Sequence, residues 1–107
     1  MSLYRQGKLA EAEACFQALL EGQPENSHLW HIQGIIAAQL KQFPEAILRL
    51  DRASQLNPDE PEIYNNIGKV RTEQGEFRAA IESLHQAIAL NPTVADYHVN
   101  LGQALKA

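Results

Sequence analysis

The sequence predicts an all-α repeat protein, a solenoid built from antiparallel helix pairs. Three observations carry this prediction: a 34-residue period, amphipathic helical segments within each period, and a proline near the end of each period. The period is visible in three columns of residues: Pro24, Pro58 and Pro92; Gly34, Gly68 and Gly102; and Ala12, Ala46 and Ala80. Because three residue types with different physical roles repeat together, chance is a poor explanation.

The period divides the chain into two complete units and two partial ones. The complete units cover residues 27–60 and 61–94. Residues 1–26 hold a unit that lacks the front of its first helix, and residues 95–107 hold the first half of a fourth. A chain of 107 residues has enough material for one compact core, so we expect a single domain.

Residues 8–21 are expected to form the first full helix, because Leu9, Phe16 and Leu19 stand one period before Phe43, Leu50 and Ala53. Residues 27–40 and 43–56 form the next two helices. Pro44 falls in the first turn of its helix, where no intrahelical hydrogen bond is lost. Pro58 ends that helix, because proline lacks a donor and disfavours helical geometry in the residue before it.

Residues 61–74 and 77–90 are expected to form the second complete pair, followed by a last helix over residues 95–106. Apolar residues within 77–90 recur at steps of three, four and one, which predicts an amphipathic helix of about four turns. Pro92 ends it as Pro58 ends the earlier one.

Short turns join the helices of each pair. Gly75 is expected in such a turn, and Lys41 replaces glycine at the equivalent position of the preceding unit. Gly7 occupies this position once more, so a remnant of a further helix would precede it. With that remnant, the expected number of helical segments is seven.

The order and spacing of residue types within one period resemble those of a known family. The complete order is an aromatic residue, an apolar-glycine pair, a turn glycine, an apolar residue, two alanines and a proline, at Tyr64, Ile67-Gly68, Gly75, Phe77, Ala80, Ala87 and Pro92, and the aromatic Trp30 and the pair Leu101-Gly102 repeat parts of it. This pattern resembles the tetratricopeptide repeat family over essentially the whole chain. Gln33 and Arg71 stand where large apolar residues are usual, and His98 fills the aromatic packing column of Trp30 and Tyr64.

The resemblance implies a right-handed superhelical solenoid whose concave side is formed by the first helix of each repeat. It also explains a local cost. Glycine inside a helix is unfavourable by about 0.5–1 kcal/mol relative to alanine. In this family the glycine column faces the second helix of its own repeat, where Ala46 or Ala80 permits close approach of the two backbones.

Composition argues against several classes of protein. With a net charge of −4, the chain lacks the positive charge that binds phosphate backbones or anionic membranes, so we expect no nucleic acid and no membrane partner. No apolar run approaches the ~20 residues of a membrane span. The first residues lack the pattern of a signal peptide, and the single Cys15 excludes an intramolecular disulfide framework, so we expect cytoplasmic localisation.

Motifs for catalysis or metal binding are absent from the sequence. No GxxxxGK, GxGxxG, GxSxG or HExxH string occurs. His28 and His31 lie three residues apart on one helix, but two ligands do not complete a site without further carboxylates or thiolates. Cys15 has no adjacent cationic residue that would activate its thiol. We therefore expect no enzyme activity, no cofactor and no metal.

The remaining candidate site is the concave groove that the resemblance implies. Its expected peptide-binding residues are His28, His31, Ile32, Ile35, Asn65, Asn66, Lys69, Asn100 and Gln103, with Gln39, Glu62, Glu73, Asp96 and Val99 beside them. Carboxamides can both donate to and accept from a peptide backbone, and Asn66 and Asn100 are separated by one repeat. This spacing resembles the asparagine ladder of the O-linked N-acetylglucosamine transferase. The alternative is that both side chains only solvate the groove.

Apolar residues of the groove indicate a second kind of contact. Ile32 and Ile35 would form an exposed apolar patch, which soluble proteins tend to avoid unless the patch contacts something. A clamp for the terminal carboxylate of chaperone tails fits poorly, because its lysine column is occupied by His31, Asn65 and Val99.

Two functions stay open. The first is a scaffold for protein-protein interaction that holds an extended peptide segment in the groove. The second is the docking arm of a larger enzyme, such as a bacterial glycosyltransferase or sulfotransferase. The apolar faces of the terminal helices either continue into further repeats or are covered by a second chain, so we expect this segment to form a homodimer.

Overall fold

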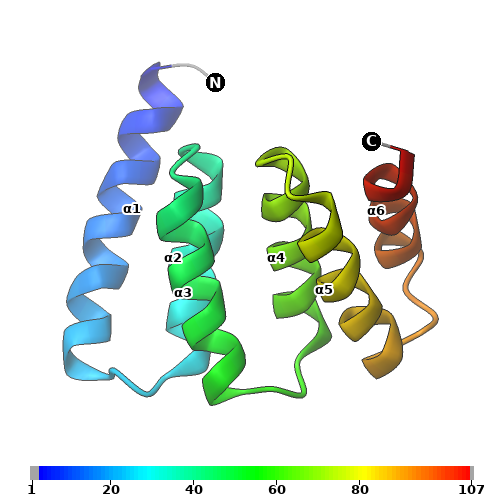
Figure 1. Cartoon of the computed structure of the whole chain (residues 1–107). Helices are drawn as coiled ribbons and strands as arrows, with labels where there is room; N and C mark the ends of the chain where they lie inside the picture. Colours follow the sequence, from blue (N-terminus) through cyan, green and yellow to red (C-terminus); the bar gives the residue numbers. More distant parts are fainter. Residues whose placement is uncertain (1–2, 107) are drawn as a thin grey trace. The chain divides into compact units, whose positions relative to one another are not determined.

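The computed structural model describes residues 3–106, with side chains from residue 7 onward, and these residues form six α-helices and no strand (Figure 1). The helices are α1 (Leu3–Gly22), α2 (Ser27–Gln39), α3 (Phe43–Leu56), α4 (Pro61–Glu73), α5 (Phe77–Leu90) and α6 (Ala95–Lys106). The predicted all-α fold class is confirmed. From α2 to α6, each boundary lies within one residue of the position expected from the sequence.

The first helix differs from the prediction. Residues 3–22 form one continuous helix with Gly7 inside it, so the predicted turn at Gly7 and the seventh helical segment are wrong. Glycine permits a reversal of the chain but does not impose one. Among the described residues no helix precedes α1 for residues 3–6 to pack against, and they extend α1 by about one turn instead.

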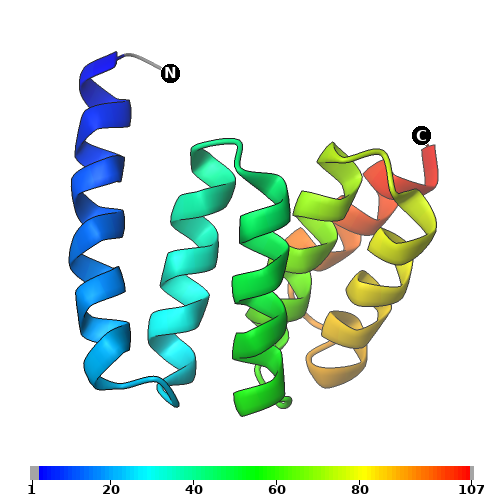
Figure 2. The same cartoon turned by 60° about the vertical axis from the view of Figure 1, so that its left-hand side comes forward.

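The chain divides into two compact units, with α1, α2 and α3 in the first and α4, α5 and α6 in the second. In the first unit α2 packs against both α1 and α3, as Figure 2 shows for the blue to green helices. In the second unit the three helices pack pairwise on one another. Each unit therefore holds one complete helix pair and one additional helix.

A glycine sets the distance between the helices of each complete pair. A Cβ atom placed on Gly34 would lie 2.7 Å from Cγ of Leu50, and one on Gly68 would lie 2.6 Å from Cγ of Leu84. In both cases the carbonyl oxygen of an alanine on the second helix is 3.3 Å away. Both leucines are fully buried. The expectation that this glycine column faces the partner helix is confirmed at these two positions.

A hydrogen bond to a proline carbonyl recurs with the repeat. Nε1 of Trp30 donates to the carbonyl oxygen of Pro24 (2.7 Å), and the hydroxyl of Tyr64 donates to that of Pro58 (2.8 Å). Nε2 of His98 lies 2.9 Å from the carbonyl oxygen of Pro92. Because a carbonyl only accepts, this contact requires the tautomer with hydrogen on Nε2. His98 therefore takes the position of Trp30 and Tyr64 in this column, as predicted, although it is exposed where they are half-buried.

The turns within the pairs adopt a left-handed backbone at the predicted position. Gly75, between α4 and α5, has φ +79°, and Lys41, between α2 and α3, has φ 63°. The residue after each turn position donates its amide hydrogen to a carbonyl five residues earlier, at 2.9 Å in both turns. A non-glycine residue pays a steric cost in this conformation, because Cβ approaches the following carbonyl oxygen.

The glycine column supplies the first prediction. Gly68→Ala should destabilise the protein by about 1–3 kcal/mol, because the new methyl group overlaps Leu84. Gly102→Ala should stabilise it by about 0.5–1 kcal/mol, because nothing described lies within 4 Å of that Cβ and alanine favours the helix. Urea unfolding at low micromolar protein concentration measures both changes. A Gly68→Ala variant whose free energy of unfolding equals or exceeds that of the parent would contradict the packing described for Gly68.

The turns supply the second prediction. Gly75→Ala should cost about 1–2 kcal/mol, because alanine disfavours positive φ. Lys41→Gly should instead stabilise the protein by about 0.5–1 kcal/mol, since relief of the same strain exceeds the extra chain entropy of glycine. Thermal melts of the two variants and the parent check the signs. A destabilised Lys41→Gly variant would show that lysine makes contacts there that outweigh the backbone strain.

Candidate functional site

Two asparagines join α4 to α6 in the second unit. Nδ2 of Asn100 donates to Oδ1 of Asn65 at 2.8 Å, and Asn65 is only 5% exposed. A buried carboxamide without such a partner would cost about 1–3 kcal/mol, so this bond supports the packing of the two helices. Both residues were predicted to face a peptide ligand. The structure instead places Asn65 in the interior and commits one amide hydrogen of the half-buried Asn100 to it.

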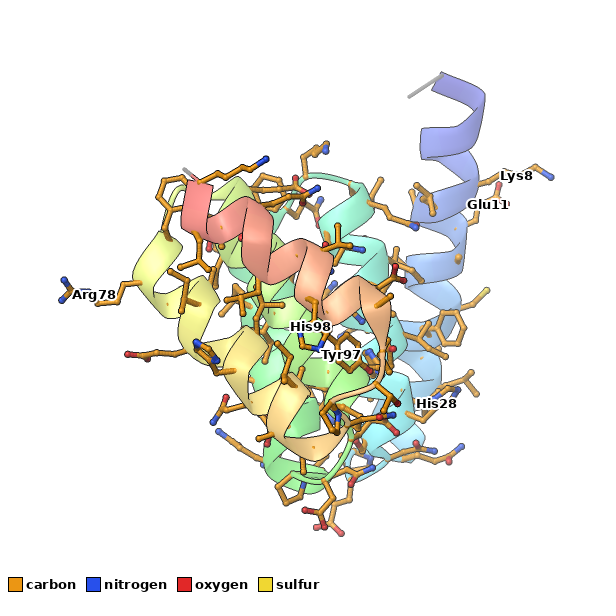
Figure 3. The ribbon with its side chains drawn as sticks, turned by 90° about the vertical axis from the view of Figure 1, so that its right-hand side faces the viewer. Lys8, Glu11, His28, Arg78, Tyr97 and His98 are labelled. Carbon is orange, nitrogen blue, oxygen red and sulfur yellow. The ribbon has the colours of Figure 1, made fainter. Side chains whose placement is uncertain are left out.

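A buried tyrosine makes a second connection between these helices. Tyr97 lies on α6 (Figure 3) and is almost fully buried. Its hydroxyl donates to Oε1 of Glu62 on α4 at 2.8 Å. Burial, followed by the hydrogen bond and the charge of Glu62, raises the pKa of Tyr97 above its ordinary value. The sequence offered one signal for this residue, since Tyr97 shares its column with the apolar residues Leu29 and Ile63.

The two bonds hold a strip of polar side chains on the surface of the second unit. On α4 the strip consists of Glu62, Asn66, Lys69 and Glu73, and on α6 of Asp96, Asn100 and Gln103. Within each helix these residues are three or four apart, the spacing of one helical face. All are exposed except the half-buried asparagines. We call this set the polar strip. It combines carboxamides with three carboxylates and one ammonium group, so its charge is acidic.

The predicted site residues of α2 belong to the first unit. His28 and Gln39 are exposed, whereas His31, Ile32 and Ile35 are half-buried. The two isoleucines, predicted to form an exposed apolar patch, are thus less exposed than expected. They present part of their apolar surface between an exposed histidine at the start of α2 and an exposed glutamine at its end.

A buried glutamine explains one departure from the expected repeat pattern. Gln33, on α2, is fully buried, and its Nε2 donates to the carbonyl oxygen of Glu13 (3.3 Å) and to Oε1 of Gln17 (3.1 Å). The carboxylate of Glu13 also pairs with Arg49 of α3 at 2.7 Å. Polar contacts therefore attach α1 to the α2–α3 pair. Sequence reasoning identified Gln33 as unusual but gave no partner for it.

A pocket outside the predicted groove lies on the first unit. It has a volume of ≈ 390 Å³ and is lined by Trp30 of α2 and by Leu48, Asp51, Arg52 and Gln55 of α3. Leu48 is among the exposed large apolar residues. The pocket is open to solvent, and sequence reasoning did not predict it.

The described part of the chain holds no candidate metal site and no candidate membrane span. No group of three or more His, Cys, Asp or Glu side chains in this range is arranged to hold a metal ion. No helix in the same range is both long and apolar enough to cross a membrane.

Family models match both parts of the chain. A model described as "Tetratricopeptide repeat" matches residues 1–61, and one described as "TPR repeat" matches residues 68–107. A search of curated proteins gave no match.

Solved structures with closely similar folds include three of different description. The first TPR of Spaghetti (RPAP3), bound to the HSP90 peptide SRMEEVD, has a TM-score of 0.90 and 22% identity, and the match covers 96% of this chain and 82% of that one. MamA gives a TM-score of 0.88 and 25% identity over 99% of this chain and 64% of its own. A mutant of the O-GlcNAc transferase of Thermobaculum terrenum gives 0.87 and 30% identity over 95% of this chain and 20% of its own.

The buried tyrosine supplies the third prediction. Because the folded state holds the pKa of Tyr97 above its unfolded value of about 10, the associated stability is complete below that pH and is lost as the pH rises beyond it. The free energy of unfolding of the parent should therefore fall more steeply above pH ~10 than that of Tyr97→Phe. Urea titrations from neutral to alkaline pH measure this difference. Parallel curves for the two proteins would contradict the burial and bonding assigned to Tyr97.

Proposed function

Because the chain belongs to the tetratricopeptide repeat family, we propose that it is a protein-interaction module that binds an extended peptide segment on the first helices of its repeats. One observation carries the proposal. The Asn65–Asn100 bond fixes α4 beside α6, so that Asn66, Lys69 and Gln103 of the polar strip are offered from two adjoining helices. Side chains held in this way lose little further freedom when they bind a ligand.

The charge of the polar strip favours a particular class of peptide. Glu62, Glu73 and Asp96 outnumber Lys69, so an acidic peptide would meet net repulsion and a basic or neutral peptide would not. The similar domain of Spaghetti was solved with the peptide SRMEEVD, which carries an acidic end. We propose that this chain prefers peptides with Lys or Arg and does not bind acidic tails of that kind.

The half-buried isoleucines of α2 add an apolar contact surface in the first unit. Ile32 and Ile35 can each accept an aliphatic side chain of a ligand, and His28 adds a polar group beside them. We propose that these residues contribute affinity for a ligand segment that lies on α2. The module needs no cofactor and has no catalysis of its own in this proposal, and cytoplasmic localisation stays part of it.

A docking arm of a larger enzyme is a second candidate. It is supported by the transferase of Thermobaculum terrenum, which is 30% identical over 95% of this chain while the match spans only 20% of that protein. The mass of the native polypeptide, read from its source by an antibody to this segment, separates the two candidates. A polypeptide longer by a catalytic domain would favour the docking arm, and one of about the present length would exclude it.

Peptide selection supplies the fourth prediction. A random heptapeptide display library panned on the 107-residue chain should enrich Lys and Arg over Asp and Glu, because of the acidic strip. Glu73→Lys should shift the enrichment towards acidic peptides. Glu82→Lys changes an exposed charge on α5, outside the strip, and is the matched control that should not shift it.

Asparagine variants refine the same experiment. Asn66→Ala should weaken the best selected peptides by up to about tenfold, the equivalent of one or two hydrogen bonds. Asn100→Ala tests binding less cleanly, because it also leaves Asn65 buried without its partner. Enrichment of acidic peptides by the parent would contradict the proposed selectivity, and unchanged affinity in Asn66→Ala would remove the role of its carboxamide.

A further inference from the structure

We propose that this chain associates head to tail with a second copy of itself, with α1 of one copy packing against the Gly102 face of α6 of the next. The two helices would then form one helix pair, shared between two chains. The proposal does not depend on the peptide-binding function. It rests on the contact between a glycine of a first helix and an alanine and leucine of a second helix, which occurs twice within the chain. The chain carries the two sides of this contact a third time, the glycine on α6 and the second-helix residues on α1.

The α6 half is a vacant glycine site. At Gly34 and Gly68 a Cβ atom would collide with a leucine of the partner helix. At Gly102, which follows Gly68 by one 34-residue period, nothing described lies within 4 Å. Leu105 on the same helix is 61% exposed, although Ala37, its counterpart two periods earlier, is fully buried. The face of α6 that would receive a second helix is thus apolar and uncovered among the described residues.

The α1 half is the matching ridge. The residues that meet Gly34 are Ala46 and Leu50, and those that meet Gly68 are Ala80 and Leu84; all four are fully buried. One period before Ala46 and Leu50 stand Ala12 and Phe16 on α1, which are only half-buried. Leu19 shows the same contrast, because it is 46% exposed whereas Ala53 and Ala87 in its column are fully buried. α1 therefore presents the second-helix side of the contact without a first helix against it.

A second pair of residues matches across the same junction. Within the second unit, Asn65 meets Asn100, the residue one position later in the next first helix. Val99 is the counterpart of Asn65 on α6 and is 55% exposed. If the repeat continues into a second copy, the next first helix is α2 of that copy, and the residue that corresponds to Asn100 is Ile32. The hydrogen-bonded pair is thus replaced by two apolar residues, each with exposed surface.

The size of Leu19 fits the junction as well. Ser27 Oγ donates to the carbonyl oxygen of Ala53 at 3.0 Å, so the first residue of α2 lies beside the alanine column of α3. In the shared pair, Ala95 takes the place of Ser27 and lies beside Leu19 of the second copy. A small first residue leaves room for the larger leucine.

Such an interface joins two different surfaces, so it is not self-complementary. Each dimer keeps one open α6 face and one open α1 face, and association continues into longer chains unless a ring closes. This differs from the homodimer expected from the sequence. It also permits a test that a symmetric interface cannot satisfy.

The test uses two variants, each with one face blocked. Gly102→Gln fills the α6 face and should not disturb the fold, because nothing described lies within 4 Å of its Cβ. Ala12→Gln blocks the α1 face. Sedimentation velocity of the parent over a concentration series should show growth beyond the dimer, and each variant alone should stay monomeric. An equimolar mixture of the two variants should form a 1:1 dimer and no larger species.

Controls keep the outcome decisive. Ala89→Gln places the same side chain on an exposed position of α5 and should associate like the parent. Circular dichroism checks the fold, and Leu19→Glu replaces Ala12→Gln if the latter unfolds, since Leu19 is already partly exposed. A parent that is monomeric at several hundred micromolar overturns the proposal. So does self-association of either blocked variant at parental strength, because that outcome requires an interface other than α1 on α6.

Discussion

The close approach of two helices at a glycine is the constraint on which each unit depends. Gly34 and Gly68 carry the intrinsic cost of glycine in a helix, about 0.5–1 kcal/mol each. In return, Leu50 and Leu84 are fully buried against them, and burial of a leucine side chain contributes about 1.5–3 kcal/mol. Glycine is therefore favoured over alanine where a second helix packs against it. At Gly102 no described atom lies within 4 Å of a Cβ position, so that glycine carries its helical cost without a leucine packed on it.

The surface chemistry follows from this packing. Once α4 and α5 are fixed on each other, α6 packs on both, and Asn65 and Tyr97 satisfy their polar groups between α4 and α6. The polar strip is what these buried contacts leave outside. The selectivity that we propose for it rests on charge, through Glu73 and Lys69. Peptide recognition by the polar strip and head-to-tail association use different faces of α6, although both proposals also assign a contact to Ile32. Variants of Glu73 and of Gly102 therefore test the two proposals separately.

The fold was predictable from the sequence because its signals are local and repeated. Helix ends are marked by Pro58 and Pro92, and the turn at Lys41 was found by period alone, although lysine is a poor residue for positive φ. Gly7 was misjudged for the same reason. Its period marks a turn, but a turn between helices also needs a helix on either side, and none precedes α1 among the described residues.

The site was less predictable, because residue type does not tell which neighbour is buried. Asn65 and Asn66 are adjacent and chemically identical, yet only Asn65 is enclosed by α6. Pairing of Tyr97 with Glu62 likewise depends on the helix-to-helix geometry. A double-mutant cycle of Gly68→Ala and Leu84→Ala tests the central constraint most directly. We expect Gly68→Ala to destabilise the parent but to be nearly neutral or stabilising beside Leu84→Ala, a coupling of about 1 kcal/mol or more. Strictly additive changes would contradict the account.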